Sequence, residues 1–342
     1  MKFKKLISVS LVTIISGSML VGCSSKDASG SKADEKLKVT MVADVGGIND
    51  QSFNQSAWEG LQKAGEDFNI DVNVLESKQA ADYTTNVETA IDEGADLVIG
   101  IGFTMDKAIG DAAKNYPDQK LAIIDYAFEN QPSNVKSMMF KSEEASYLVG
   151  LIAGKMTQTN KVGFIGGSKG NIIESFEYGY KAGVSDVNKD ADILSQYAST
   201  FSDAAKGKSI ANQMYLNKAD IIFSAAGQTG NGAIESAKEN NKYAMGVDKD
   251  QSSLAPENIL TSAIKRVDNV VYDTVKELVD GKFDGGQVIH YGLKEDAVGI
   301  PETTSKLVDK QILDFVNEQA EKVKNGEIKV PANEKQYNEY TK

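Results

Sequence analysis

From Leu37 onward, short runs of apolar residues alternate with longer segments in which apolar residues recur every three or four positions. The apolar runs predict four strands, at residues 39–43, 72–75, 97–101 and 121–124. The intervening segments predict three amphipathic helices, at residues 53–68, 84–93 and 105–114. Because the strands are apolar on both faces and helices separate them, the pattern indicates an α/β fold with a parallel sheet covered on both sides.

The same order of elements recurs further along the chain. Pairs of similar residues lie 123 positions apart: Lys38-Val39 and Lys161-Val162, Ser52-Phe53 and Ser175-Phe176, Gly60 and Gly183, and Asp125 and Asp248. A further pair, Ala95-Asp96 and Ala219-Asp220, lies 124 apart. A nearly constant offset between residues in the same structural roles predicts a duplicated α/β lobe. The alternative is coincidence in a chain rich in alanine and glycine.

Beyond Ile264 no third copy begins. The remaining segments predict a helix at 267–279, a strand-like piece at 288–293 and a helix at 307–323. These elements must complete the two sheets, which implies several crossings between the lobes and a hinge with a cleft. We expect an N-terminal lobe of residues 37–127 plus about 265–287, and a C-terminal lobe of residues 128–264 plus about 288–330.

The N-terminal segment has the pattern of a secretory signal. Three lysines within the first five residues precede an apolar run at 6–21, which serine and threonine interrupt too often for a transmembrane anchor. The ending Leu20-Val21-Gly22-Cys23 resembles a bacterial lipobox, which implies removal of residues 1–22 and attachment of fatty acids such as palmitate to Cys23. Residues 23–36 predict a flexible tether. We therefore expect a lipid-anchored protein on the extracytoplasmic face of the cell membrane.

Composition and charge exclude several classes of function. The 342 residues include 37 basic and 49 acidic side chains, for a net charge of −12, which argues against a nucleic acid polymer as partner. With one cysteine and one histidine, the chain lacks the cysteine and histidine ligands that a zinc site of the usual kind needs. The glycine-rich segments match neither a dinucleotide fingerprint nor a phosphate loop, so no cofactor is expected.

Polar and aromatic side chains follow the predicted strands, at the edge of a parallel sheet where ligands bind. These segments are 44–54, 102–104, 125–126, 166–176, 199–203, 226–230 and 247–251. Carboxylates, amides and aromatic rings with few cations suit a neutral, hydroxyl-rich ring compound. Phe53 could instead be core and Asp50 a helix N-cap. Asp125 and Asp248 are harder to explain structurally, because a carboxylate that ends an apolar strand is costly unless it is paired.

The segment Asp44–Asn54, with Trp58-Glu59-Gly60, resembles the opening signature of the basic membrane protein family, lipoproteins that bind purine nucleosides for ABC importers. Further blocks that match the family are Gly150–Gly154, Ala226–Gly232 and Gly246–Gln251. The resemblance runs from the lipobox to about Pro331. It implies the type I periplasmic-binding-protein fold, in which two Rossmann-like lobes with parallel sheets are joined by a hinge of several crossovers.

The resemblance also implies roles in holding a nucleobase. Phe53 and Phe201 would stack on the two faces of the base, and Asn54 and Asp125 would hydrogen-bond its polar edge. The internal repeat points instead to Phe176 as the partner of Phe53. Phe201 is preferred as the second stacking ring because it lies in the sequence Thr-Phe-Ser-Asp, and Phe176 stays open as the alternative.

The sugar side of the site follows in the same way. By the resemblance, Asp248 and Lys265 would hold ribose hydroxyls, Gly227 and Gln228 would line the sugar side, and Asp44 would lie at the back of the pocket.

The function implied is capture of a nucleoside such as inosine, guanosine or adenosine and its delivery to the permease of an ABC transporter. We expect a monomer that is not an enzyme. Two alternatives stay open: a secreted nucleosidase or other glycosidase that uses paired aspartates, and a ligand sensor of the same fold that feeds no transporter. The sequence does not identify the preferred nucleoside or the permease.

Overall fold

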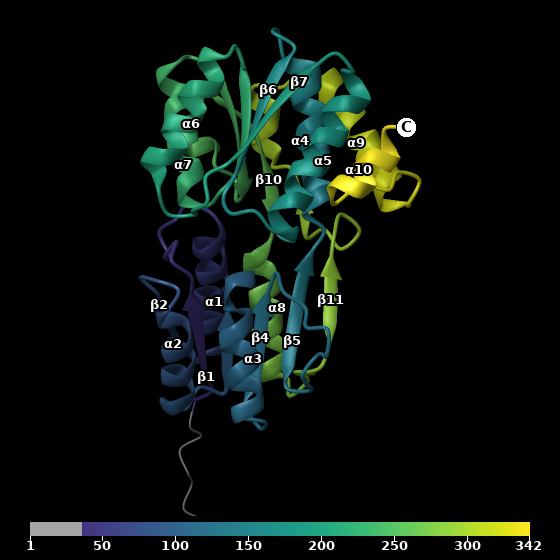
Figure 1. Ribbon diagram of the computed structural model, residues 1–342. Coiled ribbons are helices and arrows are strands. Elements are labelled where there is room, and N and C mark those ends of the chain that lie inside the picture. Colours follow the sequence, from purple (N-terminus) through teal and green to yellow (C-terminus); the bar gives the residue numbers. More distant parts are fainter. Residues whose placement is uncertain (1–35) are drawn as a thin grey trace, which may run out of the picture. The chain divides into compact units, whose positions relative to one another are not determined.

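The computed structural model describes residues 36–342 (Figure 1). The predicted signal peptide, Cys23 and nearly all of the predicted tether lie outside the described residues. Within residues 36–342 no helix combines the length and the apolar character needed to cross a bilayer.

The first of two sheets has six strands in the order β11-β5-β4-β3-β1-β2, all parallel. The strands are β1 (Lys38–Ala43), β2 (Asp71–Glu76), β3 (Leu97–Gly100), β4 (Lys120–Ile124), β5 (Val135–Phe140) and β11 (Val288–Tyr291). The helices beside it are α1 (Phe53–Phe68), α2 (Asp82–Asp92), α3 (Asp106–Asn115) and α8 (Val267–Val279). We call this sheet and its helices the first lobe.

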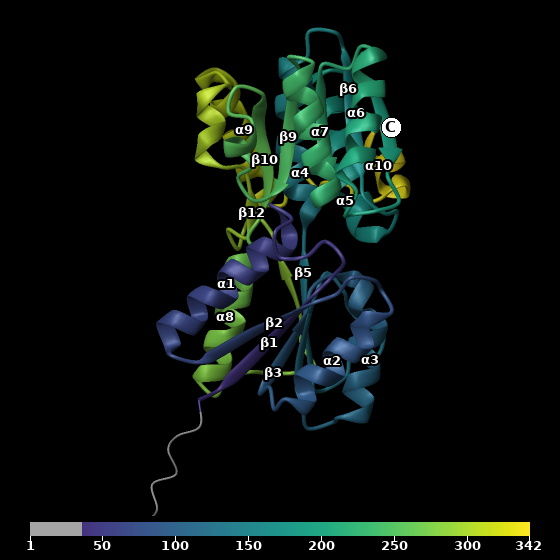
Figure 2. The same cartoon turned by 90° about the vertical axis from the view of Figure 1, so that its left-hand side faces the viewer.

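Helices cover both faces of the first sheet, as the unbroken apolar runs predict. Val39 and Met41 of β1 pack into one core cluster with residues of α1 and α8, whereas Val42 packs into another with residues of α2 and α3. Figure 2 shows α1 and α8 on one face of the sheet and α2 and α3 on the other. Successive side chains of a strand point to opposite faces, so both sets of positions must be apolar.

The second sheet repeats this arrangement. Its order is β12-β10-β9-β8-β6-β7, and only β12 runs antiparallel to its neighbour. The strands are β6 (Lys161–Gly166), β7 (Asp192–Tyr197), β8 (Ile221–Ala225), β9 (Tyr243–Asp248), β10 (Ile259–Lys265) and β12 (Val298–Gly299). The helices are α4 (Ser142–Met156), α5 (Asn171–Val187), α6 (Ala204–Leu216), α7 (Gln228–Glu239), α9 (Lys310–Lys324) and α10 (Glu334–Tyr340). These elements form the second lobe.

The equal strand orders of the two sheets confirm the duplicated α/β lobe. Each copy places its first strand between its second and third, and its fourth and fifth strands follow outward. The chain crosses between the lobes after β5, after β10 and after β11, which confirms the expected hinge of several crossovers (Figure 1).

The predicted lobe boundaries near residues 128 and 288 were wrong. Both β5 and β11 belong to the first sheet, where β5 pairs with β4 and β11 pairs with β5. The apolar pattern reveals only four strands in the first copy, which places the first crossing to the second lobe too early along the chain. Lys136 and Ser137 interrupt the apolar run of β5, which conceals it. Both are buried in the fold, Lys136 because its ammonium pairs with Glu277 of α8.

Candidate functional site

A cavity of about 580 Å³, part of it open to solvent, lies between the two lobes at the carboxyl ends of their strands. Eight of the nine predicted ligand-binding residues line it: Asp44, Phe53, Asn54, Asp125, Phe201, Gly227, Asp248 and Lys265. The ninth, Gln228, is the first residue of α7 and is not among the lining residues.

Aromatic rings enter the cavity from both lobes. Phe53 begins α1 in the first lobe, and Phe201 lies in the connection from β7 to α6 in the second. The Phe201 ring also meets Phe103 of the first lobe edge to face, with centroids 6.3 Å apart. Gly167 allows the position of Phe201, because a Cβ added there would lie 2.1 Å from Cε1 of that ring.

The rival ring, Phe176, also lines the cavity but is set deeper in the second lobe. It is 3% exposed and packs against Phe223 of β8, with centroids 6.3 Å apart. Phe201 is only partly buried. Phe176 therefore belongs to the core of its lobe, whereas Phe201 is partly buried and packs against that core.

The two strand-ending aspartates occupy equivalent places in the two lobes. Asp125 directly follows β4 and Asp248 ends β9, with φ angles of 66° and 65°. A left-handed backbone is unfavourable for residues other than glycine, although aspartate tolerates it better than most. Strain of this kind at two matching positions is typical of functional sites.

Each of these aspartates pairs with a residue of the opposite lobe. The ammonium of Lys265, at the end of β10, forms an ion pair with Oδ2 of Asp125. The hydroxyl of Ser52, just before α1, donates to Oδ2 of Asp248. Nζ of Lys265 also lies 4.6 Å from the centroid of the Phe53 ring, a cation–π arrangement. The cavity therefore places a cation, carboxylates and an aromatic face within reach of one small ligand.

Burial shifts the proton affinity of the carboxyl groups in the cavity. Desolvation raises the pKa of Asp248 to about 6, although Lys265 and the Ser52 hydroxyl act in the opposite direction. Desolvation also raises the pKa of Asp44 and Asp50, against hydrogen bonds that lower it. The carboxylates of Asp248 and Asp44 retain a high cost of burial, which a ligand with hydroxyl or N–H donors would reduce.

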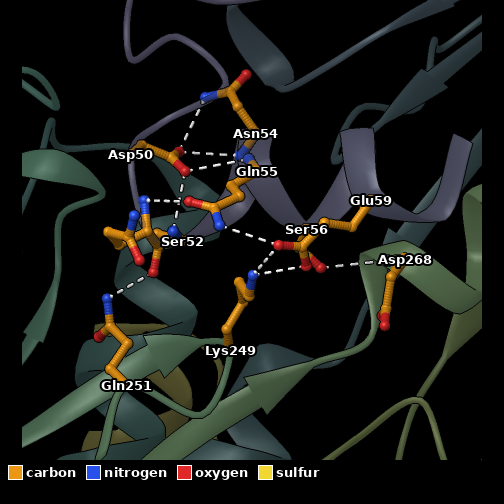
Figure 3. A network of polar contacts seen from close by, with 10 residues as sticks. Asp50, Ser52, Asn54, Gln55, Ser56, Glu59, Lys249, Gln251 and Asp268 are labelled. Carbon is orange, nitrogen blue, oxygen red and sulfur yellow. Dashed lines mark hydrogen bonds and ion pairs between the residues drawn. The ribbon is translucent and has the colours of Figure 1, made fainter. Parts of the chain in front are cut away.

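Polar contacts also join the lobes beside the cavity. Nζ of Lys249 in the second lobe lies 2.5 Å from Oε1 of Glu59 on α1. The side-chain amide of Gln251 donates to the carbonyl of Gln51 at 2.9 Å. Figure 3 shows Lys249 and Gln251 reaching toward the α1 side of the boundary. We call these two contacts the interlobe clasp.

Several lining residues were not assigned a role from the sequence. They are Gly46, Gly102, Phe103, Thr104, Ile172, Ile173, Ala225, Ala226 and Val247. Most lie in the segments that follow predicted strands, so position could have identified them. Their residue types alone gave no chemical reason to choose them. Within the described part of the chain, no group of three or more histidine, cysteine, aspartate and glutamate side chains could hold a metal ion.

Comparisons with known proteins agree with this architecture. The family model described as "ABC transporter substrate-binding protein PnrA-like" matches residues 37–334. A CD4+ T-cell-stimulating antigen of Listeria monocytogenes is 42% identical, over 96% of this chain and 99% of its own. The ABC transporter nucleoside-binding protein BmpA of Lactococcus lactis is 40% identical, over 96% of this chain and 99% of its own.

A solved structure of an ABC transporter solute-binding protein from Aeropyrum pernix superposes with a TM-score of 0.82 at 27% identity. It covers 89% of this chain and 96% of its own, which confirms the predicted type I periplasmic-binding-protein fold. Because the family model spans most of the residues and the relatives match over nearly their full length, the chain belongs to the Bmp family of PnrA-like ABC transporter substrate-binding proteins.

Proposed function

We propose that this protein captures a purine nucleoside in the interlobe cavity and delivers it to an ABC importer. The observation that carries the proposal is the convergence, from opposite lobes, of aromatic rings with the Asp125–Lys265 ion pair and Asp248 around one cavity. Aromatic rings hold a base through stacking, and charged groups hold hydroxyls through strong hydrogen bonds. The name of the Lactococcus lactis relative supports the same ligand class.

In this proposal the base lies between Phe53 and Phe201, with its polar edge toward Asn54 and Asp125. Asp248 and Lys265 hold the ribose hydroxyls, and Gly227 lies on the sugar side. Phe201 is favoured over Phe176 as the second stacking ring because its ring is less buried and contacts the opposite lobe. Stacking contributes about 1–3 kcal/mol per face, by analogy with single-stranded nucleic acid binders.

Binding to groups of both lobes favours the closed arrangement, because the ligand interacts fully only when the lobes meet. The permease would then recognise the closed form. We further propose that the protein is held at the extracytoplasmic face of the membrane through lipid on Cys23. The lipobox-like sequence Leu20–Cys23 supports this.

Mass spectrometry of small molecules released from the purified protein by denaturation tests the proposal. We expect a purine nucleoside in an amount close to one per protein. Release of a different class of compound would contradict it. The alternative of a nucleosidase is tested by incubating the protein with inosine and measuring free base and ribose, neither of which we expect to accumulate.

Gly167→Ala is expected to weaken nucleoside binding about tenfold, because the added methyl group collides with the Phe201 ring and displaces one stacking face. Isothermal titration calorimetry measures the change. Gly163→Ala within β6, the strand that precedes Gly167, is the control and keeps its affinity, because a Cβ there would meet Met214 and Ile222 instead. Equal affinities of the Gly167→Ala variant and the wild type would argue against Phe201 as a stacking ring.

Breaking the Lys249–Glu59 ion pair of the interlobe clasp is expected to weaken binding about two- to fivefold, since a partly exposed ion pair contributes little. Lys249→Glu and Glu59→Lys each place like charges across the lobes. The double variant restores the pair and should restore affinity. Lys107→Glu, which breaks an exposed pair with Asp111 inside the first lobe, is the control. Additive losses in the double variant would show that the pair does not act in closure.

A further inference from the structure

The Asp50 carboxylate lies on the wall of the cavity but has no capacity left for a ligand. It is 1% exposed. Its Oδ1 accepts from the backbone N–H groups of Ser52 at 2.9 Å and Gln55 at 3.1 Å. Its Oδ2 accepts from the backbone N–H of Asn54 at 2.9 Å and from Nδ2 of the same residue at 3.1 Å. A carboxylate has about four acceptor sites, so all are occupied (Figure 3).

These contacts fix the direction of the Asn54 side-chain amide. One Nδ2 hydrogen goes to Asp50, and the other goes to Oδ1 of Asp44 at 2.8 Å. The amide oxygen accepts from the backbone N–H of Asp44 at 3.2 Å. Turning the amide over would place its oxygen against two carboxylates. With both donors used, Asn54 can offer a ligand only the second acceptor site of its oxygen.

The other polar atom expected at the edge of the base is also an acceptor. Oδ2 of Asp125 is taken by Lys265, whereas Oδ1 is buried and has no hydrogen-bond partner among residues 36–342. A buried carboxylate oxygen without a partner is costly, and an N–H group of a ligand would remove that cost. The hydroxyl of Thr104 also lines the cavity and is likewise buried and unpartnered among the described residues. Because a hydroxyl can donate or accept, it does not decide whether this side of the cavity acts as a donor or an acceptor.

We propose that Asp50 is a positioning residue that makes the first-lobe side of the cavity a hydrogen-bond acceptor, so that the bound base must offer an N–H group there. The inference rests on the proposed nucleoside-binding function. Inosine and guanosine offer the N1–H group, and adenosine offers its amino group. Purine riboside, which has the same ring system and ribose, has no N–H on its six-membered ring.

The first test compares ligands on the wild-type protein by calorimetric titration. We expect purine riboside to bind about 10- to 100-fold more weakly than inosine, because it cannot donate the hydrogen bond to these buried or charged acceptors. If purine riboside binds as tightly as inosine, the inference is wrong while the proposed function stands. If no nucleoside binds at all, the proposed function itself fails.

The second test changes the polarity of the edge through Asp50→Asn. The introduced amide can place an N–H donor beside Asn54, so that only the two contacts with Asp44 still oppose turning of the Asn54 amide toward a ligand that accepts a hydrogen bond. Inosine should then bind about tenfold more weakly, whereas purine riboside, whose N1 accepts, should hold or gain affinity. The ratio of the two affinities therefore falls at least tenfold.

A merely structural role would lower both affinities in proportion and leave the ratio unchanged, which would overturn the inference. Asp82→Asn is the matched control, because Asp82 accepts backbone N–H groups of Lys78 and Gln79 at the start of α2, away from the cavity. It should change neither affinity nor ratio. The ligand comparison on the wild type remains decisive if the Asp50→Asn protein does not fold.

Discussion

Replacing Lys265 by methionine is expected to weaken nucleoside binding at least about 100-fold. Methionine keeps most of the apolar stem but removes the ammonium that pairs with Asp125 and lies against the Phe53 ring. Lys265 is 1% exposed and Asp125 is 5% exposed, so the variant leaves a carboxylate buried without its cation. Removing one partner of a buried ion pair costs about 3–5 kcal/mol of folding stability, and the ligand also loses the charged hydrogen bond proposed for Lys265, worth about 1.5–3 kcal/mol. Calorimetric titration measures the affinity, and thermal unfolding measures the stability.

Lys136→Met is the matched control for this variant. Lys136 is 2% exposed and pairs with Glu277 inside the first lobe, away from the cavity. We expect it to lower the free energy of unfolding and leave the affinity unchanged. Wild-type affinity in the Lys265→Met protein, or an equal loss in both variants, would contradict the assignment of Lys265 to the site.

Asp248→Asn is expected to lower nucleoside affinity about 10- to 100-fold near neutral pH and to weaken the dependence of that affinity on pH. Burial raises the pKa of Asp248 to about 6, so the wild-type carboxylate gains a proton as the pH falls below that value. A protonated carboxyl accepts hydroxyl hydrogen bonds less well. Titrations from about pH 7.5 to pH 5 should therefore show falling affinity in the wild type and a flatter profile in the variant.

The same pKa has the opposite consequence for stability. The folded protein binds the Asp248 proton more tightly than the unfolded chain, whose carboxyl has a pKa near 3.8. Between pH 6 and 4 this group therefore makes the free energy of unfolding rise as the pH falls. Chemical denaturation of the ligand-free protein at several pH values should show that contribution in the wild type only. An identical pH dependence in the Asp248→Asn protein would contradict it.

Much of the fold could be predicted because periodicity is local. The helix at 267–279 was predicted with the bounds that α8 has, and the equal offsets between Asp125 and Asp248 and between Ser52 and Ser175 indicated the duplication. The strand β5 could not be recognised from its apolar pattern. Its lysine is buried only because Glu277, far along the chain, pairs with it.

Site residues could be predicted from the sequence where they directly follow or end a strand, as Asp125 and Asp248 do. The orientation of the Asn54 amide could not be inferred, since it depends on where the carboxylates of Asp44 and Asp50 point. The contact between Glu59 and Lys249 likewise joins residues of different lobes and depends on how the lobes meet. The sequence therefore predicts which residues lie at the carboxyl edge of each sheet. It does not predict which side chains of the two lobes contact each other, because that depends on the three-dimensional fold.

Calorimetric titration of the ligand-free protein with inosine, guanosine and adenosine tests the central claim most directly. We expect at least one purine nucleoside to bind at a single site with a dissociation constant below about 1 μM, as several stacking and charged hydrogen-bond terms allow after the cost of association. Free ribose should bind far more weakly, because it cannot stack on Phe53 and Phe201. Absence of saturable binding for all three nucleosides would contradict the account.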